Sequence, residues 1–117
     1  MQFVLTSQRK NGHLVFYLSG DLDYEGARHL KETFGESLAQ GEKAFVLNME
    51  ALKIIASYSL SVILKLSYLA KKSGATMAII CPVGNVWDVF YVLEIGKVIP
   101  LFSSEDAFWQ EAANDTP

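Results

Sequence analysis

Ser57 stands where a predicted loop gives way to a helical pattern, so its hydroxyl is expected to lie close to the surface. A hydrolytic nucleophile needs a positioned base, but no G-x-S-x-G motif surrounds Ser57. His13 and His29 lie far apart without the spacing of metal ligands, and both are interpreted as surface histidines. The sequence therefore predicts neither an enzyme nor a metal site.

Other reactive or ligand-binding patterns are equally sparse. Cys81 has no second cysteine with which to form a disulfide or share a metal, and it is interpreted as a small buried hydrophobe within an apolar strand. Gly84 and Gly96 stand alone and form no glycine-rich phosphate loop. We therefore expect no bound cofactor.

Composition narrows the class of protein. A chain of 117 residues, half of them hydrophobic, is expected to form a single domain over residues 1–117. Its net charge of −3 argues against direct binding of nucleic acid. The single cysteine fits a reducing compartment, and no apolar run is long enough to insert into a membrane. The sequence thus predicts a soluble, cytoplasmic protein.

Strand patterns come from five segments of the chain. Residues 2–7 and 13–19 are apolar and flank the turn residues Lys10, Asn11 and Gly12, which predicts a β-hairpin. Residues 43–48 form a nearly continuous apolar run that is typical of a central strand. Residues 76–81 predict a second core strand ended by Pro82, and residues 97–102 a final strand at an edge.

Helical periodicity fills the intervals between these strands. Asp23 is the predicted N-cap of a helix that presents Ala27, Leu30, Phe34 and Leu38 on one face and stops at Gln40 and Gly41. Residues 57–73 predict a second helix, and residues 86–93 a short third helix closed by Gly96. Ser103 with Asp106 resembles a capping box for a last helix.

The predicted order is β-β-α-β-α-β-α-β-α. Strands that alternate with helices imply right-handed crossovers, so we expect an α/β fold with a mixed sheet of about five strands and four helices.

This order, together with local motifs, resembles the STAS domain family, and specifically its small bacterial anti-sigma factor antagonists. The first motif is GDLD at residues 20–23, and the second is VLNME at residues 46–50, where the family has a strand running into an acidic loop. The third is IASYSL at residues 55–60, where the family usually has a hydrophobic residue followed by DSSGL. The resemblance implies a STAS fold over nearly the whole chain.

The resemblance also implies a partner and a switch. In anti-sigma factor antagonists, an anti-sigma factor serine kinase phosphorylates the serine that matches Ser57. The unphosphorylated form binds that kinase and releases a sigma factor. Phosphorylation at Ser57 would place a charge of about −2 in an apolar docking surface and break the complex. The residues expected to bind the partner are Asp21, Asp23, Ile55, Ala56, Tyr58, Ser59 and Leu60.

The sequence departs from the family pattern at the switch itself. Ala56 replaces the aspartate beside the phosphoacceptor, Tyr58 replaces a small residue, and Ser59 and Ser61 replace glycines. These substitutions leave open whether Ser57 is a phosphoacceptor or a helix N-cap. They also leave open a STAS scaffold or transport-accessory domain with no phosphorylation cycle.

A further open question concerns apolar side chains outside the predicted core stripe. They belong either to the core or to an exposed patch for a partner or a homodimer. These residues are Leu60, Leu64, Trp87, Phe90 and Tyr91, with Ile54 and Ile55 ahead of Ser57.

Overall fold

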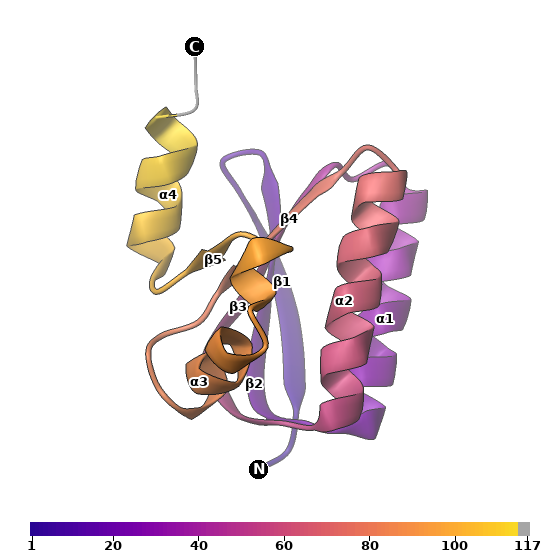
Figure 1. The fold of residues 1–117 in the computed structure, drawn as a ribbon. Coiled ribbons are helices and arrows are strands. Elements are labelled where there is room, and N and C mark those ends of the chain that lie inside the picture. The colour runs from indigo at the N-terminus through magenta and orange to yellow at the C-terminus, as the bar shows by residue number, and fades with distance from the viewer. Residues whose placement is uncertain (115–117) are drawn as a thin grey trace.

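The computed structural model describes residues 1–114 of the 117-residue chain as one mixed sheet with helices packed on it (Figure 1). The predicted order of strands and helices is confirmed, with one short 3-10 helix added. In chain order the elements are β1 (Val4–Lys10), β2 (His13–Leu22), α1 (Tyr24–Ala39), β3 (Ala44–Ile55), α2 (Ser57–Lys72), β4 (Thr76–Ile80), α3 (Asn85–Val92), η1 (Ile95–Lys97), β5 (Leu101–Phe102) and α4 (Glu105–Asn114).

Strands that follow one another in the chain are also neighbours in the sheet, whose order is β1-β2-β3-β4-β5. The predicted hairpin is confirmed: β1 and β2 are antiparallel, and Asn11 and Gly12 form their turn with φ angles of 49° and 80°. Asparagine and glycine tolerate this left-handed region best. The remaining pairs are parallel, so β2, β3 and β4 all end at one edge of the sheet.

The two faces of the sheet are covered unequally. The main core lies on the face beneath α1, α2 and α3, where these helices bury Phe34, Ile63 and Phe90. On the opposite side α4 stands apart from α1 and α2 (Figure 1) and covers a smaller cluster through Phe108. No helix among residues 1–114 is long and apolar enough to cross a membrane.

Strand β3 is longer than the sequence indicates. The prediction ended it at residue 48 and placed an acidic loop after it, but β3 continues to Ile55. It can do so because β2 also extends to Leu22, which pairs with Ile55 after two register shifts. The loop prediction is therefore wrong, and Ala56 alone separates β3 from α2.

The segment after β4 is more irregular than predicted. Gly96 was expected to close α3, but Glu94 takes the left-handed conformation after the helix, with φ of 55°. Gly96 lies instead inside η1. The predicted strand over residues 97–102 shrinks to Leu101 and Phe102, because Lys97 belongs to η1 and Pro100 precedes the pairing with β4.

Helix α4 begins one residue later than the predicted capping box. The hydroxyl of Ser104, and not that of Ser103, accepts the amide hydrogen bond of Ala107 at 3.0 Å. This shift places Glu105 in the first turn of α4, where its carboxylate faces the sheet and also benefits from the positive end of the helix dipole.

The Glu105 carboxylate connects α4 to the sheet. It accepts hydrogen bonds from Lys10 Nζ at 2.8 Å, Asn48 Nδ2 at 2.9 Å and Trp109 Nε1 at 3.0 Å. Burial raises the pKa of the Glu105 carboxyl, but the hydrogen bonds from Lys10, Trp109 and Tyr17 outweigh it, so this pKa lies below its ordinary value. The ionised form is therefore the one that holds α4 in place.

We expect Glu105→Gln to lower the free energy of unfolding by about 1–3 kcal/mol near neutral pH, because the amide keeps the shape of the side chain but leaves Lys10 without its carboxylate. Since the folded pKa of Glu105 is depressed, its contribution is present above the usual value of 4.5 and disappears as the pH falls through the folded value. Urea titrations of both proteins should converge at acid pH.

The matched control is Glu111→Gln, which changes an exposed glutamate on the same helix. This substitution should leave the free energy of unfolding nearly unchanged at every pH. A difference between parent and Glu105→Gln that stays constant down to strongly acidic pH would show that the carboxylate charge does not hold α4.

The start of α2 lacks a side-chain cap. Ala56 occupies the N-cap position with the extended φ and ψ of −78° and 153°, and its methyl group accepts no hydrogen bond. The Ser57 hydroxyl does not replace it, because Ser57 is already the first helical residue. The interpretation of Ser57 as an N-cap is therefore wrong.

We expect Ala56→Asp to raise the free energy of unfolding by about 0.5–2 kcal/mol, because a carboxylate at this position can accept from the free amides of the first turn. Thermal and urea unfolding measure the gain. Ala56→Asn is the matched control, since it caps without charge and should give a similar gain. No gain from either variant would contradict this description of the helix start.

Candidate functional site

The candidate site lies where β2 and β3 end and α1 and α2 begin. Parallel pairing brings Asp21 beside Ile54 and Leu22 beside Ile55. A single residue then connects each strand to its helix: Asp23 before α1 and Ala56 before α2. In α/β sheets this carboxyl edge is where binding sites usually form. Residues from two of the three predicted motifs, 20–23 and 55–60, therefore meet at one edge.

Gly20 and Asp23, the first and last residues of the GDLD motif, both have structural roles. Gly20 has φ of 83°, and a Cβ there would approach the backbone oxygen of Gln2 to 2.2 Å, so only glycine fits. The predicted N-cap is confirmed, because Asp23 Oδ1 accepts from the amide of Gly26 at 2.8 Å. Asp23 remains exposed, whereas the half-buried Asp21 pairs with the amino group of Met1 at 2.7 Å.

Ser59 holds the start of α2 against the end of β2. Its side chain is fully buried, and its hydroxyl donates to the backbone oxygen of Leu22 at 2.7 Å. The amide of Ala56 donates to the same oxygen at 3.1 Å. Ser59 was expected to contact a partner, but its side chain has no exposed surface with which to do so. Its role here is to position the residues around it.

Ser57 presents its hydroxyl to solvent from the first residue of α2. The structure gives this hydroxyl no hydrogen-bond partner among residues 1–114, in contrast to the bonded hydroxyls of Ser59 and Ser61. The first turn of α2 also contains no acidic residue. An anionic group attached to Ser57 would therefore face the free amides of the helix start without repulsion from within α2.

Exposed apolar side chains accompany Ser57 at this edge. The rings of Tyr24 and Tyr58 pack with their centroids 4.8 Å apart, and both rings remain partly exposed at 54% and 44%. Ile54 at the end of β3 is 60% exposed. We call Tyr24, Ile54, Ser57 and Tyr58 the Ser57 surface. Tyr24 was missed by sequence reasoning, although an aromatic residue directly after a capping aspartate was a usable signal.

The other predicted partner-binding residues contribute less exposed area. Ile55 and Leu60 are partly buried and pack against the main core, and Ala56 is partly buried at the helix start. Trp87 also packs against this core, whereas Leu64 and Tyr91 are exposed. Of the apolar residues left open by the sequence, Ile55, Leu60 and Trp87 therefore belong to the border of the core, whereas Leu64 and Tyr91 are on the surface.

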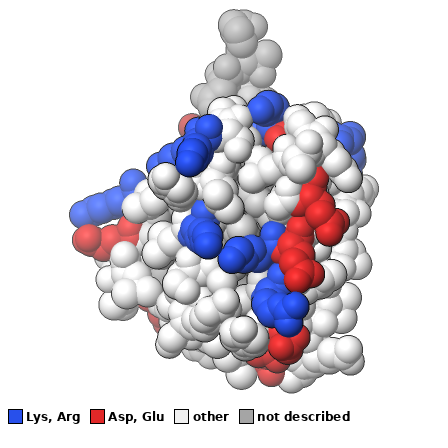
Figure 2. Space-filling model, turned by 90° about the vertical axis from the view of Figure 1, so that its right-hand side faces the viewer, with Lys and Arg blue, Asp and Glu red and all other residues white. Residues whose placement is uncertain are grey.

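Charged side chains are scattered over the neighbouring face of the molecule. Figure 2 shows lysine and arginine side chains interspersed with acidic ones over the face formed by α1 and α2. Part of this pattern consists of surface ion pairs, such as Arg28 with Glu32 at 3.4 Å. Mixed charge of this kind favours solvation. Exposed apolar side chains on this side include Tyr24 and Tyr58 at the helix starts and Leu64 and Tyr68 farther along α2.

The residues considered for catalysis or metal binding are not gathered here. Cys81 is buried, which confirms its interpretation as a core residue, and burial raises the pKa of its thiol to about 11. His13 packs its ring edge-on against Phe108 at 5.3 Å on the α4 side, and His29 is exposed on α1. Residues 1–114 contain no cluster of three or more potential metal ligands.

Comparison with known proteins agrees with this architecture. A family model described as the STAS domain matches residues 5–108. No curated protein matches the chain. An anti-sigma factor antagonist from Mycobacterium paratuberculosis has a crystal structure similar to this one, with a TM-score of 0.85 and 18% identity over 97% of this chain and 96% of that chain.

Other solved structures of similar fold have different descriptions. The Bacillus cell fate determinant SpoIIAA in its phosphorylated form matches with a TM-score of 0.70 and 18% identity, covering 93% of this chain and 98% of that chain. A sulfate transporter family protein from Wolinella succinogenes matches with a TM-score of 0.74 and 13% identity, covering 92% and 91%. At such identities the likeness shows the fold alone, but the family model spans most of the sequence. The chain therefore belongs to the STAS domain family.

Proposed function

We propose that this protein is an anti-sigma factor antagonist that binds an anti-sigma factor kinase through the Ser57 surface and thereby releases a sigma factor. The observation that carries the proposal is the exposed, unbonded hydroxyl of Ser57 on the first residue of α2, next to the exposed rings of Tyr24 and Tyr58. Exposed aromatic residues are common at the centres of protein interfaces. The proposed binding is protein-protein recognition without catalysis by this chain.

The proposed surface carries acidic residues at its border. Asp23 is exposed while it caps α1, and Asp21 lies beside it at the end of β2. Together they would meet basic side chains of a kinase. Because Asp21 already pairs with the amino group of Met1, its charge is partly compensated. Asp23 is therefore the stronger candidate for steering a positively charged partner.

Phosphorylation of Ser57 would act on the complex and leave the fold intact. The phosphate would stand at the positive end of α2, where free backbone amides stabilise its charge. On binding, the same phosphate would have to lose its water beside Tyr24 and Tyr58, and that desolvation opposes association. A phosphate on Ser57 is therefore tolerated in the free protein but opposes binding of the kinase, and this difference is the proposed switch.

A second candidate is a STAS scaffold or transport-accessory domain that is never phosphorylated. It is favoured by Ala56, which leaves Ser57 without the neighbouring carboxylate that the anti-sigma factor antagonists have. The fold likeness to a sulfate transporter family protein is also compatible with this role. Neighbouring genes distinguish the two candidates, since a serine kinase or sigma factor gene favours the first and transporter genes the second.

We expect Ser57→Asp to weaken binding to the cognate anti-sigma factor kinase by about tenfold or more, because a desolvated carboxylate in the interface costs over 1.4 kcal/mol. Isothermal titration calorimetry measures this change. Ser103→Asp is the matched control, because it adds the same charge to an exposed serine near α4 and should bind like the parent. Equal affinity of the Ser57→Asp variant would contradict the proposed docking surface.

Incubation with the same kinase and ATP tests whether Ser57 is phosphorylated, separately from whether the kinase binds. Mass spectrometry of the incubated protein should place the phosphate on Ser57, while the bonded and buried hydroxyl of Ser59 stays unmodified. If the kinase binds but Ser57 carries no phosphate, the proposed phosphorylation of Ser57 is contradicted and the scaffold function is favoured.

A further inference from the structure

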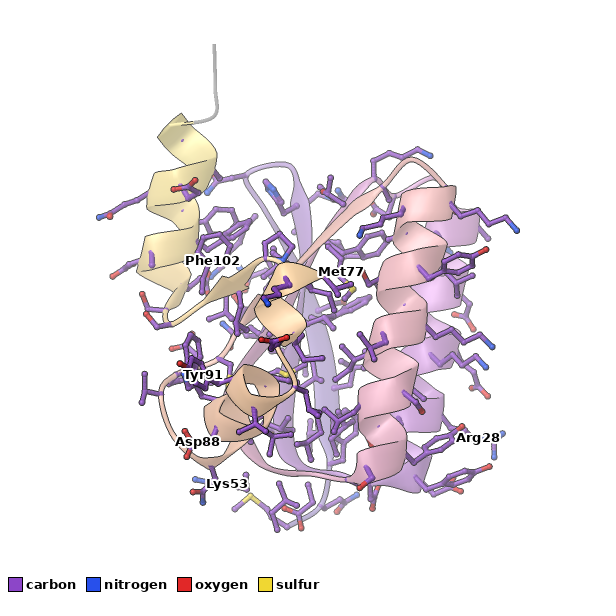
Figure 3. All side chains as sticks on the ribbon, viewed as in Figure 1. Arg28, Lys53, Met77, Asp88, Tyr91 and Phe102 are labelled. Carbon is purple, nitrogen blue, oxygen red and sulfur yellow. The ribbon has the colours of Figure 1, made fainter. Side chains whose placement is uncertain are left out.

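Consecutive apolar residues are exposed at the C-terminal end of α3 and directly after it. Tyr91, Val92 and Leu93 are 73%, 76% and 53% exposed, although Phe90 directly before them is fully buried. Tyr91 and Val92 are the last two residues of α3, and Leu93 is its C-cap. Successive residues of a helix point about 100° apart, so this end is uncovered on more than one side. Figure 3 shows Tyr91 on the side of α3 that points away from α1 and α2. We call Tyr91, Val92 and Leu93 the α3 patch.

An open groove lies beside the α3 patch. It has a volume of about 510 Å³ and is lined by Phe90, Tyr91, Val92, Glu94, Gly96, Lys97 and Leu101. The groove thus runs from α3 past η1 to the edge strand β5, which follow each other closely in Figure 1. A projecting helix end beside a groove offers both parts of a self-complementary contact. None of these residues belongs to the Ser57 surface.

Charge at this site is also self-complementary. Glu94 and Lys97 are both exposed and form an ion pair at 3.1 Å next to the α3 patch. A surface pair of this kind contributes little to the stability of the free chain, so its members can exchange partners at little cost. In a contact with two-fold symmetry, Glu94 of one copy can approach Lys97 of the other, and the reverse pair forms by symmetry. An apolar centre bordered by one acid and one base fits a second copy of the same surface.

We propose that the α3 patch and its groove form a symmetric dimer contact between two copies of this chain. The contact buries the exposed side chains of Tyr91, Val92 and Leu93 at its centre and pairs Glu94 with Lys97 across the two-fold axis. This inference goes beyond the proposed function, because it needs neither a kinase nor Ser57.

Sedimentation velocity of the full 117-residue chain tests the contact. The parent chain should dimerise as its concentration rises, and Tyr91→Glu should weaken the dimer by about tenfold or more. Tyr68→Glu is the matched control, because Tyr68 is similarly exposed at 62% but lies on α2. A parent chain that stays monomeric from micromolar to millimolar concentration would overturn the proposal, as would equal disruption by Tyr68→Glu.

Charge reversal tests the symmetry of the contact. Glu94→Lys and Lys97→Glu should each weaken self-association, because every pair across the axis would then carry like charges. An equimolar mixture of the two variants should restore a dimer with one copy of each, since every pair across the axis is again of opposite charge. A fluorescent label on one variant makes this mixed dimer visible in the same instrument. Failure of the mixture to associate would contradict the two-fold pairing, whatever the outcome with a kinase.

Discussion

The parallel pairing of β2 with β3 is the constraint on which the rest of the site depends. It runs to the last residue of each strand, where Leu22 pairs with Ile55. The backbone oxygen of Leu22 then accepts from the amide of Ala56 and from the hydroxyl of Ser59. Because these bonds join the end of one strand to the start of the helix that follows the other, α1 and α2 must begin side by side.

This arrangement separates neighbouring serines into different roles. Ser59 turns inward and satisfies a backbone oxygen, whereas Ser57, two residues earlier, faces solvent. The inward hydrogen bond of Ser59 thus explains how this chain accommodates a serine at a position where the family resemblance led us to expect glycine. The fixed starts of α1 and α2 also bring Tyr24 and Tyr58 into contact, so the apolar part of the Ser57 surface is a product of tertiary structure.

The sequence predicted the fold well because its signals were local and periodic. The hairpin turn at Asn11 and Gly12, the cap at Asp23 and the apolar faces of the first two helices all reflect interactions within a few residues. Predictions failed where a distant partner decided the outcome. Strand β3 continues to Ile55 because β2 is there to pair with it, and β5 is short because few of its residues reach β4.

The candidate site was predictable in part for the same reason. Motif order placed Ser57 at the start of a helix, although after a loop and not directly after a strand, but side-chain direction depends on where a helix begins to within one residue. A start at Ser57 with Ala56 as the cap turns Ser59 into the core and leaves Leu60 partly buried. The Glu105 hydrogen bonds were equally hidden, since they join residues from β1, β3 and α4 that are far apart in sequence.

Hydrogen exchange of the chain with and without the anti-sigma factor kinase tests the central claim most directly. The amides of Ser57 and Tyr58 have no acceptor within α2, so they should exchange rapidly in the free protein. If the Ser57 surface is the docking site, the kinase should slow exchange at residues 54–60 and around Tyr24, and leave α4 unchanged. Protection confined to α3, β5 or α4, with unchanged exchange at Ser57 and Tyr58, would contradict the account.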